Sequence, residues 1–221
     1  MQRFALIHDG SEQGWQTAYL AFHIAARLGA PLLALLVDQA TDWKKLTQRA
    51  AQVEVGGRAA ELTIQTRFVT DYSVNVLAEN SAGSDGLFIP RHLISDVEAA
   101  VHFLEALSCP LWIISQDVEL RKMAVLVGDF VADEKLIDYT SSLSRRLEQS
   151  LVGLIRASEL VRVHRSENSL TWVSLADLSQ HEVTAAFAEL GADLLFLSDS
   201  HASMLSELSM NCILYPTVKN A

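Results

Sequence analysis

Residues Asp199-Ser200-His201 carry the three side-chain types of a hydrolase's catalytic triad. A triad works because the serine hydroxyl faces the histidine ring while the carboxylate holds the ring from its other side. Adjacent residues do not normally converge in this way. The sequence also lacks the Gly-x-Ser-x-Gly turn that exposes the nucleophile of α/β-hydrolases. We therefore predict no catalytic residues, and we do not expect an enzyme.

Metal-binding patterns are also missing. The seven histidines stand at positions 8, 23, 92, 102, 164, 181 and 201, and none forms a His-x-x-x-His pair. The two cysteines, Cys109 and Cys212, form no Cys-x-x-Cys pair. We predict no metal site, and we interpret both cysteines as buried free thiols.

Two further clusters follow apolar runs. Arg91 and His92 come after Leu87–Ile89 and could hold a phosphate or a carboxylate, although a solvated loop is the simpler interpretation. Asp9-Gly10-Ser11 comes after Phe4–Ile7 and, taken alone, is typical of a turn with a helix N-cap.

The elements that must position these clusters are indicated by short apolar runs that alternate with amphipathic stretches. Near-continuous apolar runs are typical of parallel strands covered on both faces, and the alternation predicts βαβ units. One stretch has Trp15, Ala18, Tyr19, Phe22 and Ala26 at helical spacing. The predicted strands are Phe4–Ile7, Leu32–Val37, Leu87–Ile89, Leu111–Ile114, Ala124–Val127, Leu194–Leu197 and Ile213–Tyr215.

The pattern occurs twice, which predicts an internal repeat. Ala5 corresponds to Ala124 at an offset of 119 residues, and Cys109 corresponds to Cys212 at an offset of 103. The shrinking offset indicates that the second copy is shortened. We expect domains at 1–118 and 119–221, with the helix between the second and third strands of the second copy absent or a single turn. We also expect a short last helix.

Composition excludes several classes of partner. The net charge is −10, so the chain has no excess of basic side chains for a phosphate backbone or for anionic lipid. The longest apolar run, Ala30 to Val37, falls short of the roughly 18 residues that span a bilayer. The first residues do not resemble a signal peptide. We expect a cytoplasmic protein that binds neither nucleic acid nor membrane.

In several places the sequence resembles the universal stress protein family. Phe4 to Glu12 is similar to that family's first strand and Asp-Gly-Ser turn, and Ala188 to Leu194 is similar to its approach to the fourth strand. Ser108-Cys109-Pro110 is similar to its approach to the fifth strand. The resemblance implies two α/β halves of the adenine-nucleotide-α-hydrolase type. Each would be a five-stranded parallel sheet of order 3-2-1-4-5 flanked by helices. The halves would pair through their fifth strands as a pseudo-twofold dimer within one chain.

In such a Rossmann-like sheet a ligand lies where the strand order reverses, beyond the carboxyl ends of the strands. That rule brings Asp9 and Gly10 near Arg91 and His92, which we expect to line the pocket. By resemblance, Asp9 and Val37 match the family's nucleotide-contacting positions.

The family's phosphate loop, a Gly-x-x-Gly followed by nine residues and Gly-Ser/Thr, is missing from both halves. No glycine occurs between Gly86 and Gly128, and none follows Gly191. Pro90 also lacks a backbone N–H group.

Three hypotheses follow. The first is a non-enzymatic regulatory or adaptor protein of the stress response, without a cofactor. It would act on a protein partner or on an unknown small ligand. Two copies of the tandem chain could also form a homodimer. The alternative is a switch that binds ATP or AMP in the first half only, through Asp9 and Val37. The third is an enzyme of the related nucleotide α-hydrolase folds. Fold alone does not choose among them.

Overall fold

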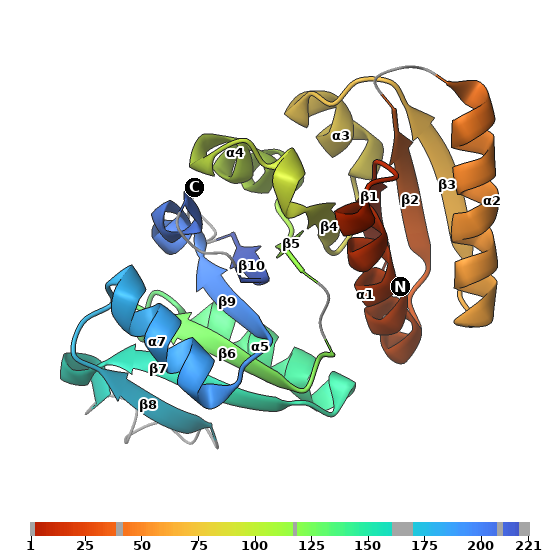
Figure 1. The fold of residues 1–221 in the computed structure, drawn as a ribbon. Coiled ribbons are helices and arrows are strands. Elements are labelled where there is room, and N and C mark those ends of the chain that lie inside the picture. Colours follow the sequence, from red (N-terminus) through yellow and green to blue (C-terminus); the bar gives the residue numbers. More distant parts are fainter. Residues whose placement is uncertain (1–2, 39–41, 117–118, 161–169, 207–209, 217–221) are drawn as a thin grey trace. The chain divides into compact units, whose positions relative to one another are not determined.

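The computed structural model describes residues 3–38, 42–116, 119–160, 170–206 and 210–216 (Figure 1). The chain divides into two compact units, Met1–Val118 and Glu119–Ala221. Among the described residues, no helix combines the length and the apolar character needed to cross a bilayer.

The first unit alternates strands and helices throughout. Its elements are β1 (Phe4–His8), α1 (Glu12–Leu28), β2 (Leu32–Val37), α2 (Trp43–Ala59), β3 (Ile64–Val69), α3 (Val74–Ser81), β4 (Leu87–Pro90), the 3₁₀ turn η1 (Arg91–Leu93), α4 (Val97–Leu107) and β5 (Leu111–Ile114).

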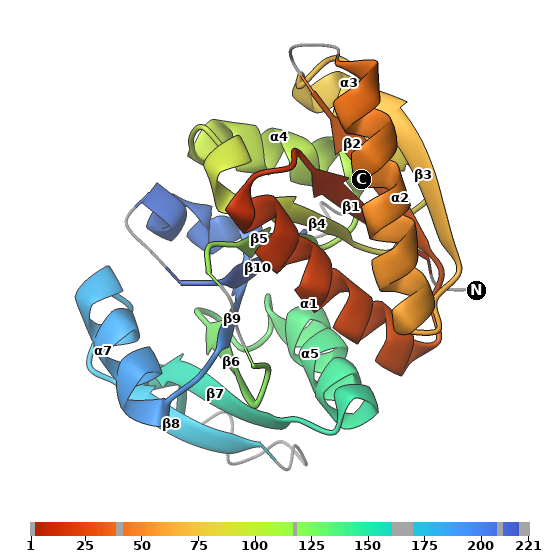
Figure 2. The same cartoon turned by 45° about the vertical axis from the view of Figure 1, so that its right-hand side comes forward.

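The strands of this unit are all parallel and lie in the order β3-β2-β1-β4-β5. Every residue of β1, β2, β4 and β5 is buried, as continuous apolar strands require. Because right-handed crossovers place them there, α1 and α2 lie side by side on one face and α3 and α4 on the other (Figure 2).

The start of α1 follows from local chemistry. Ser11 is the N-cap, and its hydroxyl accepts a hydrogen bond from the Gly14 backbone N–H at 2.9 Å. Gly10 precedes it with a φ of +85°, a conformation that favours glycine. The sequence Asp9-Gly10-Ser11 therefore forms the predicted turn and cap directly after β1.

The second unit repeats this arrangement with fewer helices among the described residues. Its elements are β6 (Lys122–Val127), α5 (Glu134–Leu147), β7 (Ser150–Arg156), the 3₁₀ turn η2 (Ala157–Glu159), β8 (Thr171–Leu175), α7 (Gln180–Leu190), β9 (Leu194–Ser198), the 3₁₀ helix η3 (Asp199–Ser206) and β10 (Cys212–Tyr215).

The strand order in the second unit is β8-β7-β6-β9-β10, again all parallel. Read from its first strand, this is the order 3-2-1-4-5, so each unit has the predicted topology. The two-half α/β architecture expected from the sequence is confirmed.

One pair of aspartates shows the repeat in side-chain detail. Asp85 lies just before β4, and its carboxylate accepts the backbone N–H of Arg3 at 2.7 Å. Asp193 lies just before β9, and its carboxylate accepts the N–H groups of Arg121 at 2.7 Å and Lys122 at 2.9 Å. In each unit this aspartate ties the fourth strand to the start of the first.

Several sequence expectations need comment. In place of a last α-helix the second unit has η3, a 3₁₀ helix, between β9 and β10. The prediction of a reduced helix between β7 and β8 falls on residues 161–169, which lie outside the described residues beyond η2. Tyr19 is 61% exposed, so the apolar stripe predicted for α1 does not lie wholly in the core.

Both cysteines are free and buried, as the sequence indicated. Burial raises the pKa of the Cys109 thiol to about 12, with a smaller effect of the same sign from Asp85. A thiol in this state is an inert part of the core.

Candidate functional site

The candidate site lies at the carboxyl ends of β1 and β4, which are neighbours in the sheet. The strand order reverses at this point, since β2 and β5 lie on opposite sides of the pair. Asp9 follows β1 and η1 follows β4, so the first unit brings its two predicted clusters together.

The central contact joins Asp9 and His92. Nε2 of His92 lies 2.6 Å from Oδ2 of Asp9, and the side chains are 41% and 12% exposed respectively. Nδ1 of the same ring lies 2.6 Å from Oε1 of Gln13. Gln13 in turn donates from Nε2 to the carbonyl of Ser115 at 2.7 Å, so both ring nitrogens have partners within the unit.

The carboxylate of Asp9 is engaged on its other side as well. Its Oδ1 accepts the Ser11 hydroxyl at 2.7 Å and the Ser11 backbone N–H at 3.1 Å. Burial alone would raise the pKa of Asp9, but the hydrogen bonds from Ser11 and His92 outweigh it and lower that pKa below its ordinary value. The structure therefore holds Asp9 as an ionised, internally bonded group.

The turn after β4 uses its own backbone donors. Pro90 has no N–H group, and the N–H of His92 donates to Oε1 of Gln13 at 2.9 Å. The N–H of Ile94 donates to the carbonyl of Arg91 at 3.0 Å. The Arg91 guanidinium donates back to the carbonyl of Ile94 at 3.0 Å. These bonds leave the turn unlike a phosphate loop, in which successive N–H groups point outward.

Val37, the other expected nucleotide contact, is hydrogen-bonded to Arg49 of α2. Nη1 of Arg49 donates to the Val37 carbonyl at 2.9 Å. The same guanidinium lies over Gly10, where a Cβ would overlap it. Because the positive φ and the lack of a side chain at Gly10 make room for Arg49, the chain's own cation covers the start of α1.

Two more titratable groups line this edge. His8 is fully buried, and its ring packs against the Trp15 indole with centroids 4.3 Å apart. Burial, reinforced by the charge of Arg49 and opposed by that of Asp9, lowers the pKa of His8 to about 4. Burial also raises the pKa of Tyr72, with Asp9 contributing in the same direction and Arg49 opposing.

The second unit closes the equivalent place in a different way. The ring of His201, from η3, lies over Gly128 at the end of β6, where a Cβ would overlap it. The buried carboxylate of Asp133 accepts the Gly128 backbone N–H at 2.8 Å. The His201 ring therefore occupies the space beyond the first strand, as His92 does in the first unit.

The serines beside His201 do not form a triad with it. The hydroxyls of Ser198 and Ser200 lie 3.0 and 3.1 Å from the same ring nitrogen, Nδ1. Nε2 lies against Gly128 and, within the part of the chain that the structure describes, has no carboxylate to orient it. Burial is the main cause that lowers the pKa of His201, and Asp133 opposes it.

Sequence reasoning missed three of the residues that shape these sites. Arg49 and Gln13 are helix residues whose reach depends on how α1 and α2 pack. Asp133 stands four residues after Asp129, where the sequence shows only an acidic turn. Among the described residues, no group of three histidine, cysteine or acidic side chains could hold a metal ion.

Similar proteins were found by comparing structures and not by comparing sequences. No family model matches the sequence, and no curated protein matches it. A universal stress protein from Archaeoglobus fulgidus DSM 4304 matches with a TM-score of 0.68 at 12% identity, covering 99% of this chain and 97% of that one. A putative universal stress protein from Pseudomonas aeruginosa UCBPP-PA14 matches with a TM-score of 0.69 at 12% identity, covering 98% and 93%.

A third similar structure is the cytoplasmic domain of a prokaryotic cation chloride cotransporter. It matches with a TM-score of 0.55 at 12% identity, covering 96% of this chain and 94% of that domain. These likenesses span both units together. They confirm the fold that the sequence resemblance implied.

Proposed function

We propose that this protein, which has the fold of the universal stress proteins, is a non-enzymatic regulatory or adaptor protein that does not bind nucleotides tightly. The fold and its tandem arrangement support a place in a stress response. The working surface would then be one that binds a protein partner or a small ligand elsewhere on the molecule.

The observation that carries this proposal is the internal occupation of the expected pocket. The resemblance carried over only Asp9 and Val37 as nucleotide contacts. Asp9 is bonded to His92 and Ser11, and the Val37 carbonyl is bonded to Arg49. A nucleotide would have to break these bonds before forming its own, so its net gain would be small.

The second unit supports the same conclusion independently. His201 lies over Gly128, and Asp133 accepts the N–H group that a phosphate or a ribose could otherwise meet. Both units therefore fill the place of the glycine-rich loop with a 3₁₀ segment whose histidine approaches the first strand.

One of the structural neighbours is a domain of a larger protein. The same fold serves as the cytoplasmic domain of a cotransporter. Fold does not imply function, but this case suits a protein that acts on a partner rather than on a substrate.

The test is a thermal and chemical denaturation titration of the wild-type chain with ATP, ADP and AMP at about 1 mM. A ligand that bound with a Kd of about 30 µM would stabilise the native state by about 2 kcal/mol. We expect less than this for all three nucleotides, and a shift of that size or more would overturn the proposal.

A matched variant shows whether the internal contacts are the reason. His92→Ala combined with Arg49→Ala removes both covering side chains and leaves Asp9 and Val37 in place. We expect nucleotide binding to increase in the double variant. His102→Ala, an exposed substitution on α4, serves as the control and should change nothing.

The alternative, a nucleotide switch confined to the first unit, requires His92 and Arg49 to move aside when the ligand binds. The ionised state of Asp9 favours it, since a carboxylate can accept ribose hydroxyls. This alternative predicts a shift in the wild type that His92→Ala enlarges and Asp9→Asn abolishes. The hydrolase hypothesis predicts release of phosphate or AMP, and we expect no turnover with any of the three nucleotides.

A further inference from the structure

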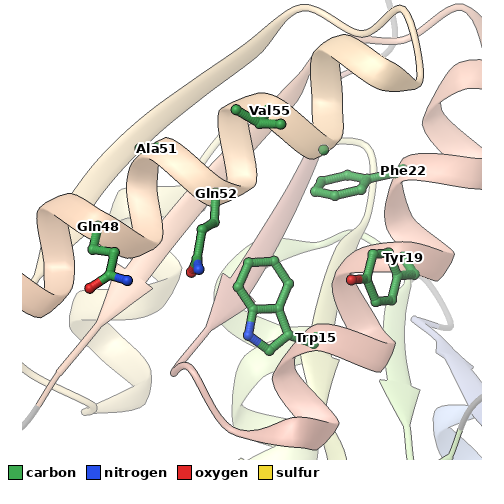
Figure 3. Close-up of a pocket in the computed structure, with 8 residues that line it drawn as sticks. Trp15, Tyr19, Phe22, Gln48, Ala51, Gln52 and Val55 are labelled. Carbon is green, nitrogen blue, oxygen red and sulfur yellow. The ribbon is translucent and has the colours of Figure 1, made fainter.

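An open groove of about 590 Å³ lies between α1 and α2, on the helical face of the first unit (Figure 3). It is separate from the Asp9 site, which lies at the carboxyl edge of the sheet. Its walls are formed mainly by Trp15, Tyr19 and Phe22 of α1 and by Gln48, Gln52 and Val55 of α2. Each set has the helical spacing of one face.

The α1 wall is aromatic along its whole length. The Trp15 and Tyr19 rings have centroids 6.1 Å apart, and the Tyr19 and Phe22 rings have centroids 6.5 Å apart in an edge-on arrangement. Tyr19 is 61% exposed, whereas Phe22 is only 4% exposed. Aromatic side chains left accessible in this way can stack with a planar ligand.

Gly56 of α2 faces Phe22 of α1. A Cβ there would come within 2.9 Å of the Phe22 ring. The absence of that side chain lets Phe22 pack against α2. Phe22 and Val55 lie at one end of the groove and Gln48 lies at the other (Figure 3).

The α2 wall supplies carboxamides rather than charges. The side chains of Gln48 and Gln52 project toward Trp15, whose indole nitrogen is turned to the same side (Figure 3). Within the described ranges, neither carboxamide nor the Trp15 N–H has a hydrogen-bond partner in the protein. The groove therefore offers neutral donors and acceptors beside apolar ring surfaces, and no lining residue is charged.

We propose that this groove binds an uncharged, planar aromatic molecule that carries both hydrogen-bond donors and acceptors. Ring surfaces on Trp15 and Tyr19 would stack with the ligand, and Gln48 and Gln52 would bond its polar edge. A charged ligand is disfavoured because no opposite charge would compensate its loss of water.

The size of the groove selects a small molecule over a protein partner. Ligand pockets commonly measure about 300–1,000 Å³, a range that includes this groove. A stable protein interface needs about 20–30 residues on each side, whereas 8 residues line this groove. The inference does not depend on the proposed function, since it uses neither Asp9, His92 nor Arg49, although Trp15 also packs against His8.

The test uses indole-3-carboxamide as the probe, with indole-3-carboxylate and cyclohexanecarboxamide as matched molecules that add a charge or remove the aromatic ring. Binding to the full ¹⁵N-labelled chain is followed by NMR at the Trp15 indole N–H and the Gln48 and Gln52 side-chain amides. We expect saturable shifts with the carboxamide, and affinities at least about tenfold weaker for both matched molecules.

Variants assign the binding to the groove. Trp15→Ala should weaken it about tenfold or more, and Gln52→Leu by about three- to tenfold. Tyr19→Ala should also weaken it, and this exposed position does not put folding at risk. Trp43→Ala is the control, because Trp43 is 57% exposed and lies outside the groove.

Three results would overturn the proposal. One is the absence of saturable shifts at the groove resonances up to the solubility limit of the probe. Another is equal binding of the carboxylate or of the saturated carboxamide. The last is a shift of the same resonances on changing protein concentration alone, which would make the groove a contact between two copies of the chain.

Discussion

Lowering the pH from 6.5 to 4 should destabilise this protein, because His8 binds a proton more readily in the unfolded chain than in the folded one. The folded-state pKa of His8 is about 4, because the ring is buried and lies near the charge of Arg49. In the unfolded chain its pKa returns to about 6.5. A histidine with a lowered folded-state pKa is neutral when folded, so the unfolded state binds more protons as the pH falls. Stability is fully present above pH 6.5 and is lost as the pH falls toward 4.

The magnitude follows from the difference between the two pKa values. A difference of about 2.5 pKa units corresponds to about 3 kcal/mol at a pH below both values. Between pH 7.5 and pH 5.5 the same relation gives a loss of about 1 kcal/mol. His201, whose pKa is also lowered by burial, contributes a further loss in the same direction.

The perturbation that isolates His8 is His8→Phe. Phenylalanine keeps a flat ring against Trp15 but cannot be protonated. It also removes the acceptor for the Gly10 N–H, a long hydrogen bond of 3.4 Å, which should lower stability equally at both pH values. The variant should therefore lose about 1 kcal/mol less than the wild type between pH 7.5 and 5.5.

The assay is urea denaturation at the two pH values, with NMR titration of the His8 ring as a direct measurement of its pKa. His102→Ala, which changes an exposed histidine of α4, is the control and should keep the wild-type dependence. If His8→Phe keeps the full wild-type pH dependence, the assignment of a buried, neutral His8 is wrong.

Three other predictions concern the repeat and the core. Asp193→Asn should destabilise the chain more than Asp85→Asn, because Asp193 accepts two backbone N–H groups and Asp85 accepts one. The free energies of unfolding from denaturation curves should differ by about 1 kcal/mol, and equal losses would contradict the reasoning. Gly128→Ala should cost about 1–3 kcal/mol through overlap with the His201 ring, with a smaller cost when His201→Ala is combined with it. Cys109 should resist iodoacetamide at pH 8 in the native state and react only on unfolding, as mass spectrometry would show, since its pKa is about 12; rapid native labelling would refute this.

Much of the fold could be predicted from local pattern. The strands found as apolar runs are those buried on both faces, such as β1 and β4, since burial on two sides demands a continuous apolar segment. Three strands were not among the predicted runs. The edge strands β3 and β8 are only partly buried, so their sequences mix polar and apolar side chains. The third, β7, was missed although its five central residues are buried.

The sequence predicted which residues meet at the candidate site, but it did not predict all the contacts that they make. The rule for open α/β sheets brought Asp9 together with His92, because strand order alone decides which loops meet. The contacts of Arg49 could not be predicted in the same way. Its side chain reaches Val37 and Gly10 only because α2 packs beside β2 and α1 at a particular height and rotation.

The tandem α/β plan and the loss of the glycine-rich loop in both halves can be predicted from the amino-acid sequence alone. These are properties of residue type and order: an apolar run requires burial, and a loop without glycine cannot form the open phosphate cradle. The contacts that replace this loop depend on tertiary packing. Hydrogen bonds such as that of His92 with Asp9 join residues from separate elements over a few ångströms, and such distances are set by the packing of helices and strands rather than by spacing along the chain.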